Sequence, residues 1–269
     1  MIKELKRCIF NYKFLIVCII SIFLFSISSY SSVWKSALNA SSATDLTPEG
    51  IKWILQTSGN KYNIWNQSFK TISIVYPILL SSVYVYSYVE EYKNNFRLLM
   101  ISREGKRKYC IHKILAIALG CGLLLLLPEM IYDIFISILS NNADILQPFD
   151  FPVYGLFPKL YTYNPNLYLL LSLGMHFCLG IAIGIFSIGI SFITENKVAT
   201  YIVPFLIILI YEIFITFITN SSMLTISSAY KFMFADGYNL IFFVIVLFLL
   251  IITGIVCLIF KERNLYING

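Results

Sequence analysis

The 269-residue chain is too apolar for a water-soluble domain, because 58% of its residues are hydrophobic and 13% are charged, against roughly 25% charged in ordinary soluble domains. Its formal net charge of +6 does not indicate nucleic acid binding, since the basic residues flank the apolar blocks. The six cysteines lie in predicted spans or their inner flanks, so neither a disulfide framework nor a metal site is expected.

The N-terminus begins with a basic, polar segment, Ile2 to Tyr12, and continues into an apolar stretch. This order resembles a secretory signal peptide. No small-x-small cleavage motif closes the stretch, so we predict that it is retained as a first membrane span.

Six apolar segments are long enough to cross a hydrocarbon layer about 30 Å thick, which takes roughly 20 helical residues. Backbone groups in lipid must bond within their own segment, and the segments lack the alternation of barrel strands, so helices are expected. We predict an all-α polytopic membrane protein with one transmembrane domain over 1–269. The predicted spans are 14–30, 72–89, 114–139, 167–193, 198–218 and 240–260.

The basic residues predict the orientation. Most of them, and every arginine, fall on the side of the N-terminus if the spans alternate. By the positive-inside rule, both termini are then cytoplasmic in a cell membrane protein.

Three connections are long enough to hold structure of their own. The outer loop 31–70 contains Trp34, Trp53 and Trp65, and tryptophan is enriched at headgroup level, so short interfacial helices are expected there. The second outer connection, 141–166, is rich in proline and is predicted to be an irregular loop. The moderately apolar stretch 219–238 could dip into the membrane and return.

The cytoplasmic segment 90–113 joins the second and third spans. Phe96, Leu99 and Met100 recur at helical spacing while Arg97 and Arg103 point elsewhere, which predicts a short amphipathic helix. Two interpretations remain open: a basic loop that touches anionic lipid, or a helix that docks a cytoplasmic partner.

This segment, together with the six-span topology, resembles the membrane subunit of ABC exporters of the type-2 permease class. Asn94 and Asn95 stand where that family often has glycine and threonine. The matching features are an acidic residue after the second span (Glu90 or Glu91), the short helix from Phe96 to Met100, Ser102, Arg107 and Lys113.

The resemblance implies a lateral N-terminal helix at 2–12, re-entrant helices within 219–236, and a dimer with a second copy or a sister permease. It also implies export of an amphipathic substrate such as a peptide, antibiotic or lipid-linked molecule. The candidate residues for contact with the ATPase are Glu90, Glu91, Phe96, Arg97 and Arg103.

The chain has no G-x-x-x-x-G-K-[ST] phosphate-binding sequence. We therefore predict a transport subunit that is not itself an enzyme and binds no cofactor of its own. ATP and magnesium would be bound by a separate cytoplasmic ATPase subunit, and membrane lipids would be further partners.

Three acidic residues lie in the outer halves of predicted spans: Glu129, Asp133 and Glu212. A charged side chain in hydrocarbon costs roughly 2.5 to 3.5 kcal/mol on insertion scales, so each must face protein or water. They are candidates for a substrate path, and the alternative is structural pairing with a tyrosine or lysine.

The fourth span contains Gly180 and Gly184 in a G-x-x-x-G step, which lets two helices approach closely. Packing within the subunit is favoured over a dimer seam. His176 in the same span is interpreted as a packed hydrogen-bonding residue.

Two other classes of function stay open. Paired glutamates followed by an arginine also occur in membrane proteases of the CAAX type, but here Arg97 comes six residues after Glu91, and the only histidines are His112 and His176. An ATP-independent immunity or binding protein would leave no local signature.

Overall fold

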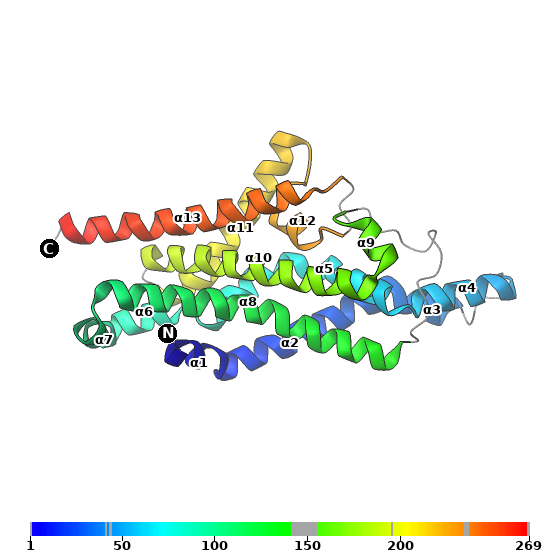
Figure 1. Cartoon of the computed structure of the whole chain (residues 1–269), viewed down its shortest axis with the longest axis horizontal. Helices are drawn as coiled ribbons and strands as arrows, with labels where there is room; N and C mark the ends of the chain where they lie inside the picture. Colours follow the sequence, from blue (N-terminus) through cyan, green and yellow to red (C-terminus); the bar gives the residue numbers. More distant parts are fainter. Residues whose placement is uncertain are drawn as a thin grey trace.

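The computed structural model describes residues 2–40, 42, 45–140, 155–194, 196–233 and 237–267, and this part of the chain is all-α. Figure 1 shows most of the long helices running roughly along one axis, while the helix drawn in yellow crosses them steeply. The helices are α1 Ile2–Ile9, α2 Tyr12–Ser29, the π-helical turn η1 Tyr30–Trp34, α3 Lys35–Ala40, α4 Pro48–Ser58, α5 Lys61–Val83, α6 Ser87–Lys93, α7 Phe96–Glu104, α8 Lys106–Leu139, α9 Pro158–Tyr163, α10 Pro165–Thr194, α11 Lys197–Thr219, α12 Ile226–Tyr230 and α13 Leu240–Ile267.

Six helical stretches within the described residues are long and apolar enough to cross a membrane, as the sequence predicts, and the chain is a multi-pass membrane protein. They are Tyr12–Ala40, Lys61–Lys93, Lys106–Leu139, Pro165–Thr194, Lys197–Thr219 and Leu240–Phe260. Several exceed the expected span lengths. The 34 residues of α8 extend over about 51 Å at helical rise, so this helix continues beyond a hydrocarbon layer of about 30 Å.

The connection expected as an outer loop at 31–70 is largely helical. The first span continues through η1 into α3, α4 follows, and α5 already begins at Lys61. The reason for the early start is local: the side chain of Asn60 accepts hydrogen bonds from the backbone N–H groups of Tyr62 and Asn63 and caps the helix. Lys70 consequently lies within α5 and not in the loop.

The second outer connection is helical in part, since α9 spans Pro158–Tyr163. Residues 141–154 of the predicted loop lie outside the described residues. Before the last span, the described part of the predicted re-entrant stretch contains one short helix, α12, while Asp236 lies outside the described residues.

The centre of the bundle is formed by α8 and α10, which pack against each other through glycine. A Cβ atom on Gly180 would lie 2.8 Å from the Cys121 carbonyl oxygen, and one on Gly184 would lie 3.1 Å from the Ala118 Cα. The G-x-x-x-G step therefore packs within the chain. On its other side α10 meets α13, where a Cβ atom on Gly189 would lie 2.4 Å from the Gly254 carbonyl oxygen.

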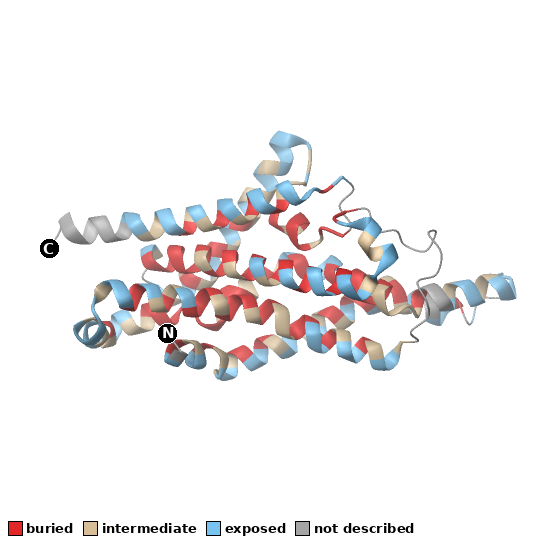
Figure 2. Cartoon of the chain, viewed as in Figure 1, coloured by how far each residue is buried: buried red, intermediate tan, exposed pale blue. Residues whose placement is uncertain are grey.

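The outer layer is far less covered. Buried residues are concentrated in α5, α8 and α10, whereas α11 and α13 present mostly exposed apolar side chains (Figure 2). Such faces are expected where a helix meets lipid. α1 and the C-terminal part of α13 lie toward the end of the bundle that carries α6 and α7 (Figure 1), as an even number of spans requires.

Candidate functional site

The end of the bundle formed by α1, α6, α7 and the start of α8 carries the predicted coupling segment (Figure 1). Its helices are separated by two sharp turns. Asn95 adopts a left-handed conformation, φ 55°, between α6 and α7, and Gly105, φ 82°, joins α7 to α8. Asparagine tolerates this region better than most residues, and glycine adopts it without strain. The third span therefore begins at Lys106, eight residues earlier than predicted.

Lys113 is the centre of a buried ionic cluster at this end. Its side chain is 0% exposed, and its Nζ lies 2.7 Å from Glu91 Oε1 and 3.4 Å from Glu4 Oε2. The same lysine also lies over the ring of Tyr84. Because a buried ammonium is stable only when it is paired and hydrogen-bonded, these contacts explain how a lysine is tolerated there.

Both carboxylates of the cluster have further partners. The Tyr109 hydroxyl donates to Glu91 Oε2 at 2.6 Å, the Tyr84 hydroxyl donates to Glu4 Oε2 at 2.8 Å, and Arg7 donates to Glu4 Oε1 at 3.1 Å. Burial alone would raise the pKa of Glu4, but Lys113, Tyr84 and Arg7 outweigh it and hold that pKa below its ordinary value. The N-terminal helix α1 is thereby tied to α8 through Lys113 and to Tyr84 at the end of α5, and Lys113 links it onward to Glu91 of α6.

Glu90 makes a separate ion pair, with Lys197 at the start of α11. Lys197 and Lys13 also lie over the ring of Tyr86, 4.9 and 3.6 Å from its centroid. Glu90 and Glu91 are thus adjacent in sequence but contact different helices, so α6 is connected to both α8 and α11.

The remaining predicted contact residues occupy different environments on α7. Arg97 is buried, with its guanidinium 5.4 Å from the Tyr88 ring centroid; it packs inside the protein, whereas the amphipathic pattern predicted that it points away from the apolar face. Phe96 lies half-buried beneath Arg7. Arg103 is exposed.

The first turn of α7 exposes two leucines to the outside, while Ser102, Arg103 and Glu104 are exposed at its end. Leu98 and Leu99 are 64% and 59% exposed, while Met100 and Ile101 pack toward the core. A helix is therefore present where it was predicted, but its faces differ from the predicted amphipathic pattern, since Leu99 is exposed and Arg97 is buried.

A pocket of about 500 Å³ opens beside this segment. The buried hydroxyl of Ser87 in its wall has no hydrogen-bond partner among the described residues. The lining residues are Arg7, Asn11, Tyr84, Tyr86, Ser87, Glu90, Glu91, Asn94 and Phe96. The candidate coupling residues Glu90, Glu91 and Phe96 thus line one cavity, whereas Arg97 and Arg103 do not.

The three acidic residues of the spans are each paired. Glu129 Oε2 lies 2.8 Å from His176 Nδ1, and both side chains are 0% exposed. Asp133 forms a 3.0 Å ion pair with Lys61 at the start of α5. Glu212 accepts the backbone N–H of Ser227 at 2.7 Å. The structure does not bring these three carboxylates together around one site.

Glu4 and Tyr230 are two of the network residues that were not among the predicted site residues. Glu4 carries no sequence signal beyond an acidic residue within a basic segment, and Tyr230 lies in a stretch that is only moderately apolar. His176 was expected to be a hydrogen-bonding residue, but its partner Glu129 is 47 positions away, so no local pattern relates the two.

The partners of Glu90, Glu91 and His112 bear on the interpretation of the chain as a membrane protease. Lys113 and Tyr109 contact Glu91, Lys197 contacts Glu90, and His112 lies instead beside Glu104. Among the described residues, no group of three or more histidine, cysteine, aspartate or glutamate side chains could hold a metal ion.

No protein-family model matches the chain, and no similar curated protein or solved structure was found.

Proposed function

We propose that this chain is the permease subunit of an ATP-driven ABC transporter that exports an amphipathic substrate, with ATP hydrolysed by a separate cytoplasmic subunit. In this proposal the chain works as a dimer with itself or a sister permease, in the cell membrane, with both termini cytoplasmic. The observation that supports it best is the exposed apolar surface of α7, Leu98 and Leu99, at the end of the bundle where the two predicted cytoplasmic termini lie.

The connections of α7 to its neighbours would let this helix transmit a movement to the membrane spans. It is joined to α8 by a single residue, Gly105, and its inner side is anchored by the buried Arg97. Displacement of α7 would therefore move α8, and the Lys113 cluster would carry α1 along. A partner shifts the balance of two conformations only through contacts that differ between them, and this end of the bundle offers such contacts.

The acidic residues of the spans bear on the substrate path. Glu129 and Glu212 are occupied by protein partners, so we assign them to holding the helices. The Asp133–Lys61 pair keeps some exposure, with side chains 19% and 13% exposed, and is the better candidate for contact with a passing substrate. α12 is proposed as the re-entrant element.

Purification in mild detergent tests the proposal. The wild-type chain should retain an ATPase subunit that binds ATP, and the double variant Leu98→Glu/Leu99→Glu should lose it, because two carboxylates on the apolar surface of α7 oppose docking. Tyr163→Glu, at a 91% exposed position on α9 at the other end of the bundle, is the matched control and should retain it.

Absence of any ATPase from the wild-type preparation would contradict the proposal and favour an ATP-independent binding or immunity protein. Retention of the ATPase by the double variant would show that α7 is not the docking surface.

A further inference from the structure

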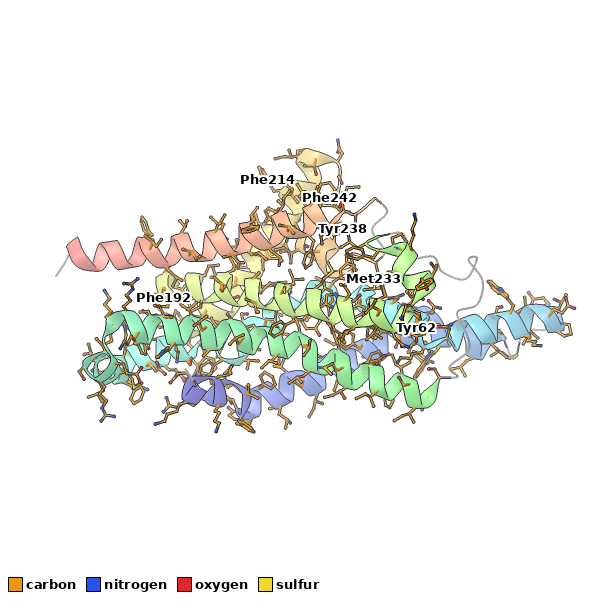
Figure 3. The ribbon with its side chains drawn as sticks, viewed as in Figure 1. Tyr62, Phe192, Phe214, Met233, Tyr238 and Phe242 are labelled. Carbon is orange, nitrogen blue, oxygen red and sulfur yellow. The ribbon has the colours of Figure 1, made fainter. Side chains whose placement is uncertain are left out.

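The segment around α12 fills the outer part of the bundle although much of its sequence is polar. Ile226, Ala229 and Tyr230 of α12, and Phe232 and Met233 after it, are all buried. α12 lies beside α5 and α10, well inside the length of the bundle (Figure 1), and the buried Met233 is labelled near α9 and α10 in Figure 3.

α12 is attached to α11 by direct hydrogen bonds. The Tyr211 hydroxyl donates to the Leu224 carbonyl at 2.9 Å, and Glu212 accepts the Ser227 N–H at 2.7 Å. The buried residues of α11 are Thr200, Pro204 and Ile208, a single stripe toward the bundle, and Lys197 at its start pairs with Glu90 of α6. α11 and α12 are therefore linked directly by hydrogen bonds.

Among the described residues, the hydrogen bonds from α12 to α8 and α10 are made by Tyr230. Its carbonyl accepts from His176 Nε2 at 3.0 Å, and its hydroxyl donates to Glu129 Oε1 at 3.1 Å. The chain after α12 is held instead by Gly155 and Leu156, whose N–H groups donate to the carbonyls of Met233 and Phe232.

The hydrogen-bond pattern sets the number of protons in this network. A carbonyl oxygen only accepts, so His176 Nε2 carries a hydrogen. Nδ1 then faces Glu129 Oε2 at 2.8 Å, and that contact needs exactly one proton, on the imidazole or on the carboxyl. The pair is neutral overall in either form, which is what a fully buried site favours.

Apolar packing adds to this attachment but does not make it specific. Tyr230 packs against the rings of Phe69 and Tyr76, with centroids 5.3 and 4.8 Å away. Lipid tails are as apolar as these neighbours, so burial against protein gives little preference over lipid, whereas hydrogen bonds and close packing do.

We propose that α12 is a latched plug, meaning a short segment that closes the outer part of the bundle and is held in place by the one-proton network of Glu129, His176 and Tyr230. The latch acts through hydrogen-bond geometry and not through net charge. The inference does not depend on ATP-driven transport.

The prediction separates two substitutions of one residue. In Glu129→Gln the side-chain amide donates to Nδ1 and its oxygen accepts from Tyr230, so every bond is kept without the proton. Glu129→Leu has similar volume but leaves the imidazole and the hydroxyl unpaired. Tyr230→Phe removes a single hydrogen bond and provides a milder variant.

The assay is labelling of Ser228→Cys by a water-soluble maleimide in lipid nanodiscs, which leave both membrane faces open. Ser228 is buried on α12, and the chain with Ser228 intact gives the background from native cysteines. We expect slow labelling with Glu129 or Glu129→Gln, a rise of about tenfold with Glu129→Leu, and a smaller rise with Tyr230→Phe.

Ser172→Cys, buried on α10, is the control and should stay protected throughout. Three results would overturn the proposal: Glu129→Leu labelling at the wild-type rate, Glu129→Gln labelling as fast as Glu129→Leu, or Ser172→Cys opening together with α12, which would mean that the whole bundle had loosened.

Discussion

Replacing Lys113 with methionine should destabilise the protein far more than replacing any exposed lysine. Methionine keeps most of the side-chain volume and removes the charge, which leaves Glu4 and Glu91 facing each other with side chains only 12% and 13% exposed. At an effective dielectric constant of about 20, separations of 2.7 and 3.4 Å correspond to attractions of about 6 and 5 kcal/mol before desolvation is subtracted.

The net loss is smaller than these attractions. Removing one partner of a buried pair costs about 3 to 5 kcal/mol. We expect a value near 3 kcal/mol, because Tyr109, Tyr84 and Arg7 still donate to the carboxylates. For a chain of this size that loss lowers the midpoint of thermal unfolding by roughly 5 to 10 °C.

Thermal unfolding in detergent, followed by intrinsic fluorescence, measures the effect. Lys108→Met, at an exposed position on the same helix, is the matched control and should change the midpoint by less than about 2 °C. Adding Glu4→Gln and Glu91→Gln to Lys113→Met removes the uncompensated charges and should recover most of the loss. A Lys113→Met protein as stable as the wild type, or a triple variant less stable than the single one, would refute the reasoning.

Two further outcomes follow from the same structure. The pKa of Glu4 in the folded protein lies below its ordinary value of 4.5, so the ionised carboxylate stabilises the fold above pH 4.5, and this contribution is lost as the pH falls through the lower folded-state pKa. The difference in unfolding midpoint between the wild type and Glu4→Gln should therefore be constant near neutrality and shrink in acid. A difference that grows in acid would contradict this prediction. Gly180→Ala should lower the free energy of unfolding by about 1 to 3 kcal/mol, because the added Cβ atom meets the α8 backbone. In the control Gly174→Ala, on the same helix, the added Cβ atom has no neighbour within 4 Å, so this substitution should be neutral or stabilising. Equal effects of the two substitutions in thermal unfolding would argue against the α8–α10 packing.

The candidate site could be predicted only in part. The existence of the α7 helix followed from the spacing of its apolar residues, and the helix is present. Which side faces the bundle did not follow, since a single amphipathic turn can rest on either lipid or protein. Arg97 became a buried residue because Tyr88 and Tyr92 of the preceding helix surround it, and helix α6 ends in a turn whose direction depends on the left-handed Asn95.

The sequence by itself determined that this is a helical membrane protein with six apolar segments long enough to span, because lipid admits only segments that satisfy their own backbone and its thickness sets their length. Helix ends beyond the apolar blocks, as at Lys61 and Lys106, depended on caps and turns. Tertiary structure alone decided which distant residues meet: the polar pairs of Lys113 with Glu4 and Glu129 with His176, and the close packing of Gly189 against Gly254. The physical reason is that an isolated helix fixes only neighbours three or four residues apart, whereas these partners lie on different helices, and only the packing of the bundle brings them within contact.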